Sequence, residues 1–373
     1  MIRICFVFPS IYPYMQGEIA GGAHRQLDLL GRQLQEEFEV HFIAGDYGQD
    51  KTVEMDGFTF HRSYPPSPDT PAYKQFNQAI SLFDAMRRSE ADLFIHRGGV
   101  KNAVVSSSIS RALSTPWMYH VAKDTDLTPT ETGVNRLLHV AFSRVLKNAN
   151  AVVAQTDKQA RLVADRFHRN AEVIPNGYPE VEDQLSHTER EYFLWVGRIR
   201  EEQKRPHLYL DLAEGLPDCD FVLVGDIERE NDYAEKIKQR ANSLQNVSYL
   251  GFVDPDEIHS YYRRAKAVVN TSAHEGFPST FLESWRYDTP VISLDVDTGR
   301  FANVEDSRGY AKGNFQKLIQ IVSQISDDPK ERQRIVHPYG EYFTDNFTID
   351  TVSKNYSNVI QTVLQNHDEC DGI

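Results

Sequence analysis

The sequence predicts an α/β protein made of two doubly wound, Rossmann-like domains. Short apolar runs, typical of buried parallel strands, alternate with longer helix-periodic stretches along the chain. The alternation is interrupted by one polar segment with Pro and Asn-Gly, residues 174–191, which reads as a linker. The 373 residues are too many for one small core and suit two domains of ordinary size.

The first domain is expected over residues 1–180. It opens with the near-continuous apolar run IRICFVF at residues 2–8, as a strand buried on both faces should. The stretch VEMDGFTFHRSY (53–64) has Asp-Gly between two strand-like segments and predicts an extra hairpin. Further strands are expected at 40–44, 92–96, 117–120 and 151–155, and helices at 23–34, 73–88, 101–113, 134–147 and 158–167.

The second domain is expected over residues 181–345. A further helix, 346–373, is expected to pack back on the first domain, and the tail from 316 to 365 predicts two or three helices in all. Strands are expected at 192–196, 221–224, 247–250, 267–270 and 290–294, and helices at 205–214, 233–243, 256–264 and 280–287.

Composition indicates a soluble globular protein, with 40% hydrophobic and 25% charged residues. No apolar run approaches the ~18 residues of a membrane span, and the start of the chain lacks the small-residue cleavage site of a signal peptide. Cys5, Cys219 and Cys370 have no metal-binding or disulfide spacing. We therefore expect a cytoplasmic protein without a bound metal or cofactor.

The net charge of −14 argues against nucleic-acid binding, and most of it lies in the second half of the chain. Within the nearly neutral first half, the stretch from Arg136 to Arg169 is rich in Lys and Arg and contains only two acids, Asp157 and Asp165. Two interpretations stay open. The stretch is either an ordinary solvated helical face or a patch for an anionic acceptor or the inner face of a membrane.

Doubly wound domains bind ligands beyond the carboxyl ends of their strands, where the strand order reverses. The stretch WVGRIREEQKRP (195–206) follows such a strand end. Gly197 lets the backbone turn, and Arg198 and Lys204 supply two cations that suit a diphosphate. The alternative is that both cations pair with nearby surface acids.

A second stretch, HEGFPSTFLESWRYDTPVISLD (274–295), places Glu275 and Glu283 eight residues apart. Eight helical residues rise about 12 Å, whereas glycosidase carboxylates lie about 5–5.5 or 6.5–9.5 Å apart, which disfavours an acid/base pair. Glu283 fits a capping box with Thr280 as its N-cap. Glu275 has no such structural role. A helix N-terminus beside Glu275 could hold an anion. That anion would repel the Glu275 carboxylate unless the carboxylate contacted uncharged groups, so we expect it to bind sugar hydroxyls.

Four segments in order carry a resemblance to a known family: VGRIREEQKRP, VLVGD (222–226), VSYLGFVDPDEIHSYYRRAKAVVNTSAHEGFPSTFLES (247–284) and TPVISLD (289–295). Over about 100 residues they resemble the carboxyl-terminal domain of retaining GT-B glycosyltransferases with an E-x7-E motif, glycosyltransferase family four, group 1. The first half resembles it more weakly, through Gly21-Gly22, YHVAKD and IPNG. The GT-B fold implies two doubly wound domains facing a central cleft.

The resemblance implies transfer of a hexosyl group from a nucleotide sugar to a glycan, lipid-linked or other acceptor, with retention and without a metal. Arg198 and Lys204 would neutralise the diphosphate as catalytic and donor-binding residues. Glu275 would contact the transferred sugar, also as a catalytic residue, and Glu283 would bind the ribose. The remaining donor-binding positions would be backbone groups at Gly197, Gly276, Phe277, Ser279 and Thr280.

Two residues of the first domain enter through the same resemblance. His120 matches a catalytic histidine that faces the reacting centre, and Gly22 matches a glycine whose backbone closes over donor phosphates or acceptor. From the residues alone, a satisfied strand-end histidine and a helix N-cap turn fit these positions as well. Asn176 fits a turn residue better than a ligand contact.

The chain departs from the family pattern at three places. The spacing from Arg198 to Lys204 is one residue longer than usual, Pro278 stands where Gly is frequent, and DVDTGRFANVEDSRGY (295–310) replaces the usual Gly-Gly…Pro-Glu loop. Asp295-Val-Asp297 resembles the metal-binding D-x-D of another glycosyltransferase fold. However, D-x-D recurs at 124, 218 and 254, so it does not predict a metal site.

Two other functions stay open at this point. One is a catalytically inactive sugar- or nucleotide-binding protein on the same fold, which would bind a donor without turning it over. The other is a nucleotide-sugar epimerase, which would yield an isomerised sugar nucleotide and no acceptor product.

Overall fold

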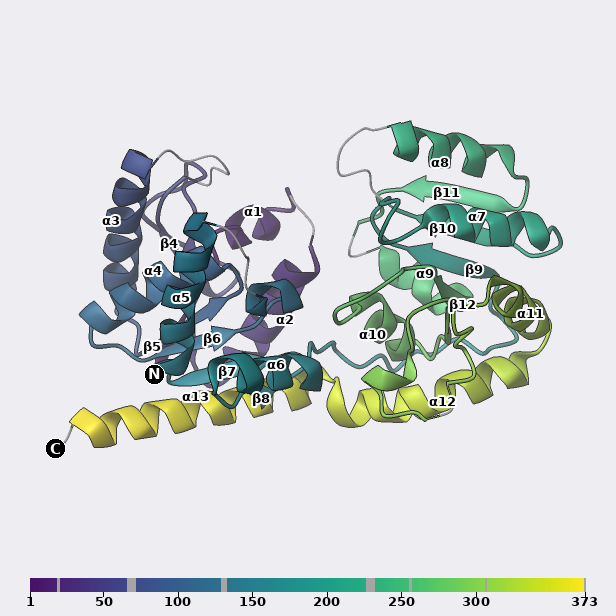
Figure 1. Cartoon of the computed structure of the whole chain (residues 1–373). Coiled ribbons are helices and arrows are strands. Elements are labelled where there is room, and N and C mark those ends of the chain that lie inside the picture. Colours follow the sequence, from purple (N-terminus) through teal and green to yellow (C-terminus); the bar gives the residue numbers. More distant parts are fainter. Residues whose placement is uncertain are drawn as a thin grey trace. The chain divides into compact units, whose positions relative to one another are not determined.

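The computed structural model covers the chain and describes every residue except 19–20, 66–71, 129–132, 226–231, 255–256, 306 and 372–373. The chain divides into two compact units (Figure 1). Unit 1 comprises Met1–Gly177 and Ile349–Ile373, and unit 2 comprises Tyr178–Thr348. Each unit has a mainly or wholly parallel sheet between helices, so the doubly wound α/β class is confirmed in both.

The sheet of unit 1 has eight strands in the order β3-β4-β2-β1-β5-β6-β7-β8. Its neighbouring strands are parallel except for the β3–β4 pair. The strand order reverses between β1 and β5. The strands are β1 (Arg3–Val7), β2 (Glu39–Ala44), β3 (Thr52–Met55), β4 (Phe58–Arg62), β5 (Leu93–Arg97), β6 (Trp117–His120), β7 (Ala151–Ala154) and β8 (Glu172–Val173).

Helices cover both faces of this sheet. Alternate residues of β1 enter two different cores, because Ile4 belongs to one and Cys5 to the other. On the Ile4 side lie α1 (Ile11–Met15), α2 (Gly22–Leu34) and the long terminal helix α13 (Ile349–Asp371), yellow in Figure 1. On the Cys5 side lie α3 (Ala72–Ser89), α4 (Val100–Ala112), α5 (Gly133–Lys147) and α6 (Asp157–Phe167), with the short η1 (Asp124–Leu127) after β6.

The hairpin predicted from the Asp-Gly pair is confirmed. Strands β3 and β4 pair antiparallel with Met55 opposite Phe58. The two turn residues, Asp56 and Gly57, have φ angles of 54° and 81°. Positive φ at both positions is the requirement of a type I′ turn, which Asp-Gly meets at little cost.

Unit 2 has a five-stranded parallel sheet in the order β11-β10-β9-β12-β13. The chain runs outward from β9 through β10 to β11 and then returns to β12 on the opposite side of β9. The strand order therefore reverses between β9 and β12, and ligands of doubly wound domains bind at such a point. The strands are β9 (Tyr192–Val196), β10 (Phe221–Val224), β11 (Val247–Gly251), β12 (Ala265–Asn270) and β13 (Val291–Ser293).

The core of unit 2 forms where Phe193 and Trp195 of β9 meet the apolar faces of the helices. The three helices of the tail, α11, α12 and α13, agree with the expected two or three. None of the described helices is both long and apolar enough to cross a bilayer. The helices of unit 2 are α7 (Pro206–Gly215), α8 (Asp232–Ser243), α9 (Ile258–Arg264), α10 (Ser279–Arg286), η2 (Gly299–Phe301), α11 (Phe315–Ser326) and α12 (Pro329–Asn346).

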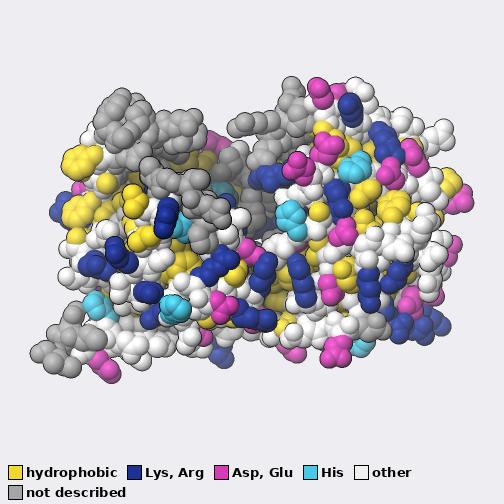
Figure 2. Space-filling model, in the orientation of Figure 1, with side chains coloured by type: hydrophobic (Ala, Val, Ile, Leu, Met, Phe, Trp, Pro, Cys, Tyr) yellow, Lys and Arg dark blue, Asp and Glu magenta, His cyan; other side chains and the backbone are white. Residues whose placement is uncertain are grey.

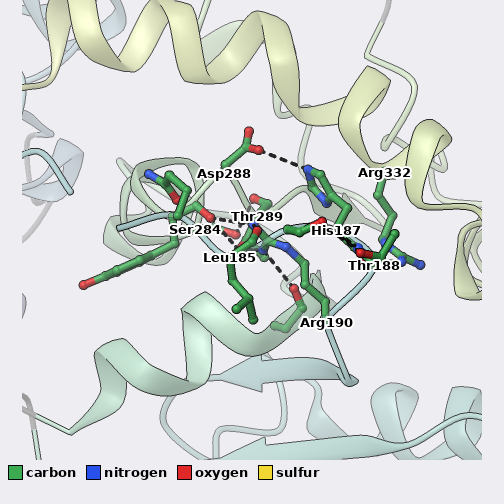
Figure 3. Close-up of polar contacts among 12 residues, drawn as sticks. Leu185, His187, Thr188, Arg190, Ser284, Asp288, Thr289 and Arg332 are labelled. Carbon is green, nitrogen blue, oxygen red and sulfur yellow. Dashed lines mark hydrogen bonds and ion pairs between the residues drawn. The ribbon is translucent and has the colours of Figure 1, made fainter. Parts of the chain in front are cut away.

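Two buried arginines, Arg190 and Arg332, hold the segment 185–190 near the start of unit 2. Arg190 donates hydrogen bonds to the carbonyl groups of Leu185 and Tyr287, at 3.2 and 2.8 Å. Arg332 of α12 donates to the carbonyl of His187 at 2.5 Å. Figure 3 shows both guanidinium groups beside this stretch of main chain. Main-chain carbonyls thus accept hydrogen bonds from both buried guanidinium groups and hold the segment against the body of unit 2.

We expect the stability of unit 1 to depend on pH through a buried histidine pair. His41 Nδ1 and His61 Nε2 lie 3.0 Å apart, and burial lowers the pKa of each to about 4. The unfolded chain takes up protons below about pH 6.5, whereas the folded state does not. The free energy of unfolding should therefore decrease as pH falls from about 6.5 toward about 4.

Urea unfolding at about pH 7 and about pH 5 measures this decrease. A His61→Gln variant should lose less stability over the same interval, because it has one fewer buried imidazole. An equal loss in both proteins would contradict the assignment.

Candidate functional site

The carboxyl ends of β9 and β12 bring together two charged residues that the sequence singled out. Lys204 lies in the loop after β9 and Glu275 in the loop after β12. Lys204 Nζ is 2.5 Å from Glu275 Oε1, and the Glu275 side chain is only 7% exposed. The two residues thus form a largely buried ion pair at the point where the strand order reverses.

The buried hydroxyl of Thr271 joins these two loops. Its Oγ1 donates to the carbonyl of Lys204 at 2.7 Å and accepts from Trp195 Nε1 at 3.0 Å. Close by, the Ala273 amide donates to the carbonyl of Gln203 at 2.8 Å. These bonds fix the main chain on both sides of the ion pair, so its geometry does not depend on the two flexible side chains alone.

Gly197 lies in a tightly packed turn. Its carbonyl oxygen would be 2.5 Å from a Cβ at Gly225, the residue after β10, so that residue has no room for a side chain. Arg198 follows Gly197 directly and is exposed. The Lys204 amide then donates to the carbonyl of Arg200 at 3.1 Å, closing a turn. The loop from Arg198 to Lys204 thus contains a hydrogen-bonded turn.

The capping box predicted for Thr280 and Glu283 is wrong. Helix α10 begins at Ser279 with Pro278 as its N-cap, and no side chain caps it. Because the N-cap is Pro278, two residues before the expected Thr280, Thr280 lies inside the first turn and Glu283 lies beyond the position that could reach back to the N-cap.

Glu283 is instead buried between two basic side chains. Its Oε2 lies 3.7 Å from His259 Nδ1 of α9 and 3.6 Å from Arg286 Nη1 of α10. Sequence reasoning missed both partners. Arg286 follows Glu283 by three residues, a spacing that places two side chains on one helix face, so a local signal existed for it.

Gly276 leaves open space beside Glu275. A Cβ built on it would meet no atom within 4 Å. The next residue, Phe277, is anchored by ring contacts with Phe301 and Phe347, at centroid distances of 5.7 and 5.6 Å. The loop therefore combines a fixed aromatic side chain with an uncovered stretch of main chain. Ser279 and Thr280 follow it in the first turn of α10, whose N-terminus carries a partial positive charge.

Arg300 is a further residue of this site that sequence reasoning missed. Its Nη2 donates to the main-chain carbonyl of Glu275 at 3.0 Å, and its guanidinium lies 4.5 Å from the centre of the Phe301 ring. Both residues belong to the loop 295–310 that departs from the family pattern. The difference between this loop and the family pattern was the sequence signal that could have pointed to Arg300.

The same loop contains the D-x-D pair. Asp295 forms an ion pair with Arg205, and Asp297 Oδ1 accepts a hydrogen bond from the Gly299 amide at 3.0 Å. Both carboxylates are therefore engaged by the protein itself. Within the described ranges, no three His, Cys, Asp or Glu side chains gather as a metal site would require.

In unit 1, His120 ends β6 and is buried. Its Nδ1 lies 3.1 Å from the hydroxyl of Tyr356 on α13. Burial is the main cause of a pKa well below the ordinary histidine value, which keeps the ring neutral, and the nearby Arg97 acts in the same direction. Its Nε2 makes no hydrogen bond to the described part of the chain. His120 is thus oriented by a helix 236 residues away in sequence.

The other two positions of unit 1 lie on main-chain turns. Gly22 is the first residue of α2, and Gly21 before it is an N-cap without a side-chain hydrogen bond. Asn176 is buried, and its Oδ1 accepts from Arg97 Nη2 at 3.2 Å. Asn176 therefore makes a structural contact inside unit 1 at the end of the first segment of the chain.

Two family models match the chain. The model described as Glycosyl transferases group 1 matches residues 179–338, and the model described as Glycosyl transferase 4-like domain matches residues 21–177. Together they match most of the chain. The chain therefore belongs to the group 1 glycosyltransferases, the family that its motifs resemble.

Individual proteins agree with this membership. O-antigen chain mannosyltransferase C of Escherichia coli is 28% identical over 181 residues, which cover 47% of this chain and 47% of that protein. A Campylobacter jejuni protein named GalNAc-alpha-(1->4)-GalNAc-alpha-(1->3)-diNAcBac-PP-undecaprenol alpha-1,4-N-acetyl-D-galactosaminyltransferase is 23% identical over 383 residues, which cover 97% and 99%. In several matches, however, the chain spans about half the length of its curated relative.

The fold is also that of a solved structure. Sucrose-phosphate synthase from Thermosynechococcus elongatus superposes with a TM-score of 0.75 over 98% of this chain and 100% of that one, at 16% identity. At this identity the likeness concerns the fold alone.

A Thr271→Val substitution should destabilise unit 2. Valine has a similar shape but no hydroxyl, so Trp195 Nε1 and the Lys204 carbonyl lose a buried partner. We expect the free energy of unfolding to fall by about 2 kcal/mol, measured by urea denaturation. Thr271→Ser keeps the hydroxyl and is the matched control. Equal stability of the two variants would contradict the role given to Thr271.

Proposed function

We propose that the chain is a retaining glycosyltransferase that moves a hexosyl group from a nucleotide sugar to a glycan or lipid-linked acceptor. The observation that carries the proposal is the Lys204–Glu275 pair at the reversal of strand order in unit 2. Lys204 supplies a cation that suits a diphosphate, and Glu275 supplies a carboxylate that suits sugar hydroxyls. Both lie where doubly wound domains bind ligands. Membership of the family supports the same chemistry.

Donor binding is proposed to exchange the partners of this pair. Lys204 would leave Glu275 for the donor diphosphate, to which the exposed Arg198 on the same loop would add a second cation. Glu275 would then accept hydrogen bonds from hydroxyls of the transferred sugar. As the bond from sugar to diphosphate breaks, negative charge develops on the leaving group, and nearby fixed cations stabilise it in the transition state.

Glu283 is proposed to bind the ribose of the nucleotide. A carboxylate accepts hydrogen bonds from two vicinal hydroxyls, and such charge-assisted bonds are strong. His259 and Arg286 beside it would keep the carboxylate oriented. The arrangement supports a positioning role for these two residues.

His120 enters the proposal through its motif, YHVAKD. A neutral imidazole can accept or donate a hydrogen bond, and with Nδ1 in contact with Tyr356, the buried Nε2 has no partner in the described part of the chain. We propose that His120 takes part in the transfer, as this motif implies.

The acceptor is proposed to be lipid-linked or a glycan, because the name of the Campylobacter relative describes an undecaprenol-linked oligosaccharide. A lipid-linked acceptor keeps its tail in the bilayer, so the proposed place of action is the cytoplasmic face of a membrane. The diphosphate would be neutralised by side chains, so turnover should persist after treatment with EDTA. Retention is checked by the anomeric coupling of the product.

Donor turnover tests the proposal directly. A thermal-shift panel of nucleoside diphosphates and nucleotide sugars first identifies the donor, since a ligand that binds the native state raises the melting temperature. Glu275→Gln should then lower nucleotide release about 100-fold, a typical effect of losing one group that stabilises a transition state. The nucleoside diphosphate alone should still stabilise this variant.

Three outcomes would refute the assignment. Unchanged turnover in Glu275→Gln would remove Glu275 from the reaction. Donor binding without any turnover in the unaltered protein would indicate an inactive binding protein. An isomerised nucleotide sugar without an acceptor product would indicate an epimerase.

A Gly276→Ala substitution should weaken donor binding without affecting stability. The new methyl group would meet no protein atom, so the melting temperature of the free protein should not change. In the proposed complex the methyl group would occupy space beside the transferred sugar, and KM for the donor should rise at least about tenfold, equivalent to about 1.4 kcal/mol. Gly215→Ala, whose methyl group would make only an ordinary contact with Ile319, is the control. An unchanged KM would place the sugar elsewhere.

A further inference from the structure

We propose that one face of unit 1, formed by exposed side chains of α3 and α5, docks on an anionic lipid bilayer. The inference extends the membrane contact of the proposed function by naming the surface that makes it. Its test is vesicle binding, which does not depend on turnover.

Large apolar side chains gather on this face. On α3, Phe76, Ile80 and Phe83 follow one another at spacings of four and three residues, which puts them on one side of the helix. On α5, Leu137 and Val140 do the same. Phe76 is 71% and Leu137 is 73% exposed, so these are not partly covered core residues. Exposed apolar residues are ordinary singly, but a group of five on two helices indicates an interaction surface.

The two helices present these residues at the same end of unit 1. Both pack on α4 over one face of the sheet. Each connects two parallel strands and therefore runs antiparallel to them, so its first turns lie toward the carboxyl edge. The apolar residues occupy the first turns of α5 and the first two thirds of α3. Figure 2 shows hydrophobic side chains at the surface over this part of unit 1.

Cations accompany the apolar group on α5. Arg136, Arg144 and Lys147 are exposed, and none of them forms an ion pair with a described residue. Arg136 adjoins Leu137, and the other two lie about two to three turns further along the helix. Their charges are therefore available to an external partner.

Three cations further along the basic stretch, by contrast, contact groups inside unit 1. Lys158 Nζ pairs with Asp124 Oδ2 at 2.7 Å, and Arg166 donates to the Leu127 carbonyl at 2.9 Å. Arg169 donates to the carbonyl of Ala149 at 2.7 Å. Of the basic stretch 136–169, these three cations thus make contacts within the fold, whereas Arg161 of α6 is exposed and, like the cations of α5, forms no ion pair with a described residue.

Charge favours a bilayer over a second copy of the chain. In a two-fold symmetric contact the same surface meets itself, so the cations of α5 would face each other. An anionic bilayer complements them, while the aromatic and aliphatic side chains enter the boundary between headgroups and acyl chains. The apolar end also lies at the carboxyl edge of the sheet, where His120 ends β6. A lipid-linked acceptor would thus reach that edge without leaving the membrane.

Vesicle co-sedimentation tests the proposal. The unaltered protein should bind vesicles of phosphatidylcholine with about 30% phosphatidylglycerol, and added salt should weaken binding by screening. The double variant Phe76→Ser, Ile80→Ser should bind at least about tenfold more weakly. The matched control is Leu250→Ser, Phe252→Ser, which removes two exposed apolar side chains from unit 2 and should bind normally.

A charge series completes the test. Arg144→Glu with Lys147→Glu should abolish the preference for phosphatidylglycerol, whereas Lys236→Glu with Lys238→Glu on the exposed side of α8 should not. Each variant must keep its melting temperature and its response to the nucleoside diphosphate, which reports on unit 2. A variant that passes these checks and loses vesicle binding fails in docking, not in folding or donor binding.

Two results would overturn the proposal. One is absence of binding to phosphatidylglycerol vesicles by the unaltered protein, or equal binding by the Phe76/Ile80 variant. The other is a dimer in light scattering that the same variant dissociates, which would assign the surface to a second copy.

Discussion

The arrangement of the loops after β9 and β12 depends on the hydroxyl of Thr271. A hydroxyl donates one hydrogen bond and accepts up to two, so a single small side chain can connect three parts of the chain. Here it reaches the main chain of the loop after β9 and the indole of Trp195 within the core of unit 2. The position of Lys204 is therefore set by the body of the domain.

Much of the fold was predictable because short sequence patterns specify its strands and turns. Buried parallel strands are short apolar runs, and the two-residue hairpin needs the positive φ angles that Asp56-Gly57 supplies. The meeting of Lys204 with Glu275 follows from topology, since the carboxyl ends of parallel strands share one edge. Two residues 71 positions apart could thus be related before any coordinates were considered.

Other features depend on tertiary contacts that leave no periodic pattern in the sequence. Tyr356 reaches His120 only because α13 packs beside α2 in unit 1. Arg300 reaches the Glu275 carbonyl from a loop of irregular conformation. The prediction of a capping box was wrong for a local reason, because the first residue of a helix is uncertain by one or two positions. With Pro278 at the N-cap, the hydroxyl of Thr280 falls at a position where it cannot cap.

The ion pair of Lys204 and Glu275 also sets a condition on what the site accepts. In the proposed reaction, a ligand that offers only a phosphate separates the pair and leaves a carboxylate without compensation in a largely buried place. A ligand that offers only hydroxyls leaves an ammonium in the same situation. Uncompensated buried charge is costly, so free phosphate and free sugar are both poor competitors. Only a molecule that joins an anion to a sugar satisfies both residues together, and the proposed site thereby requires two chemical features at once.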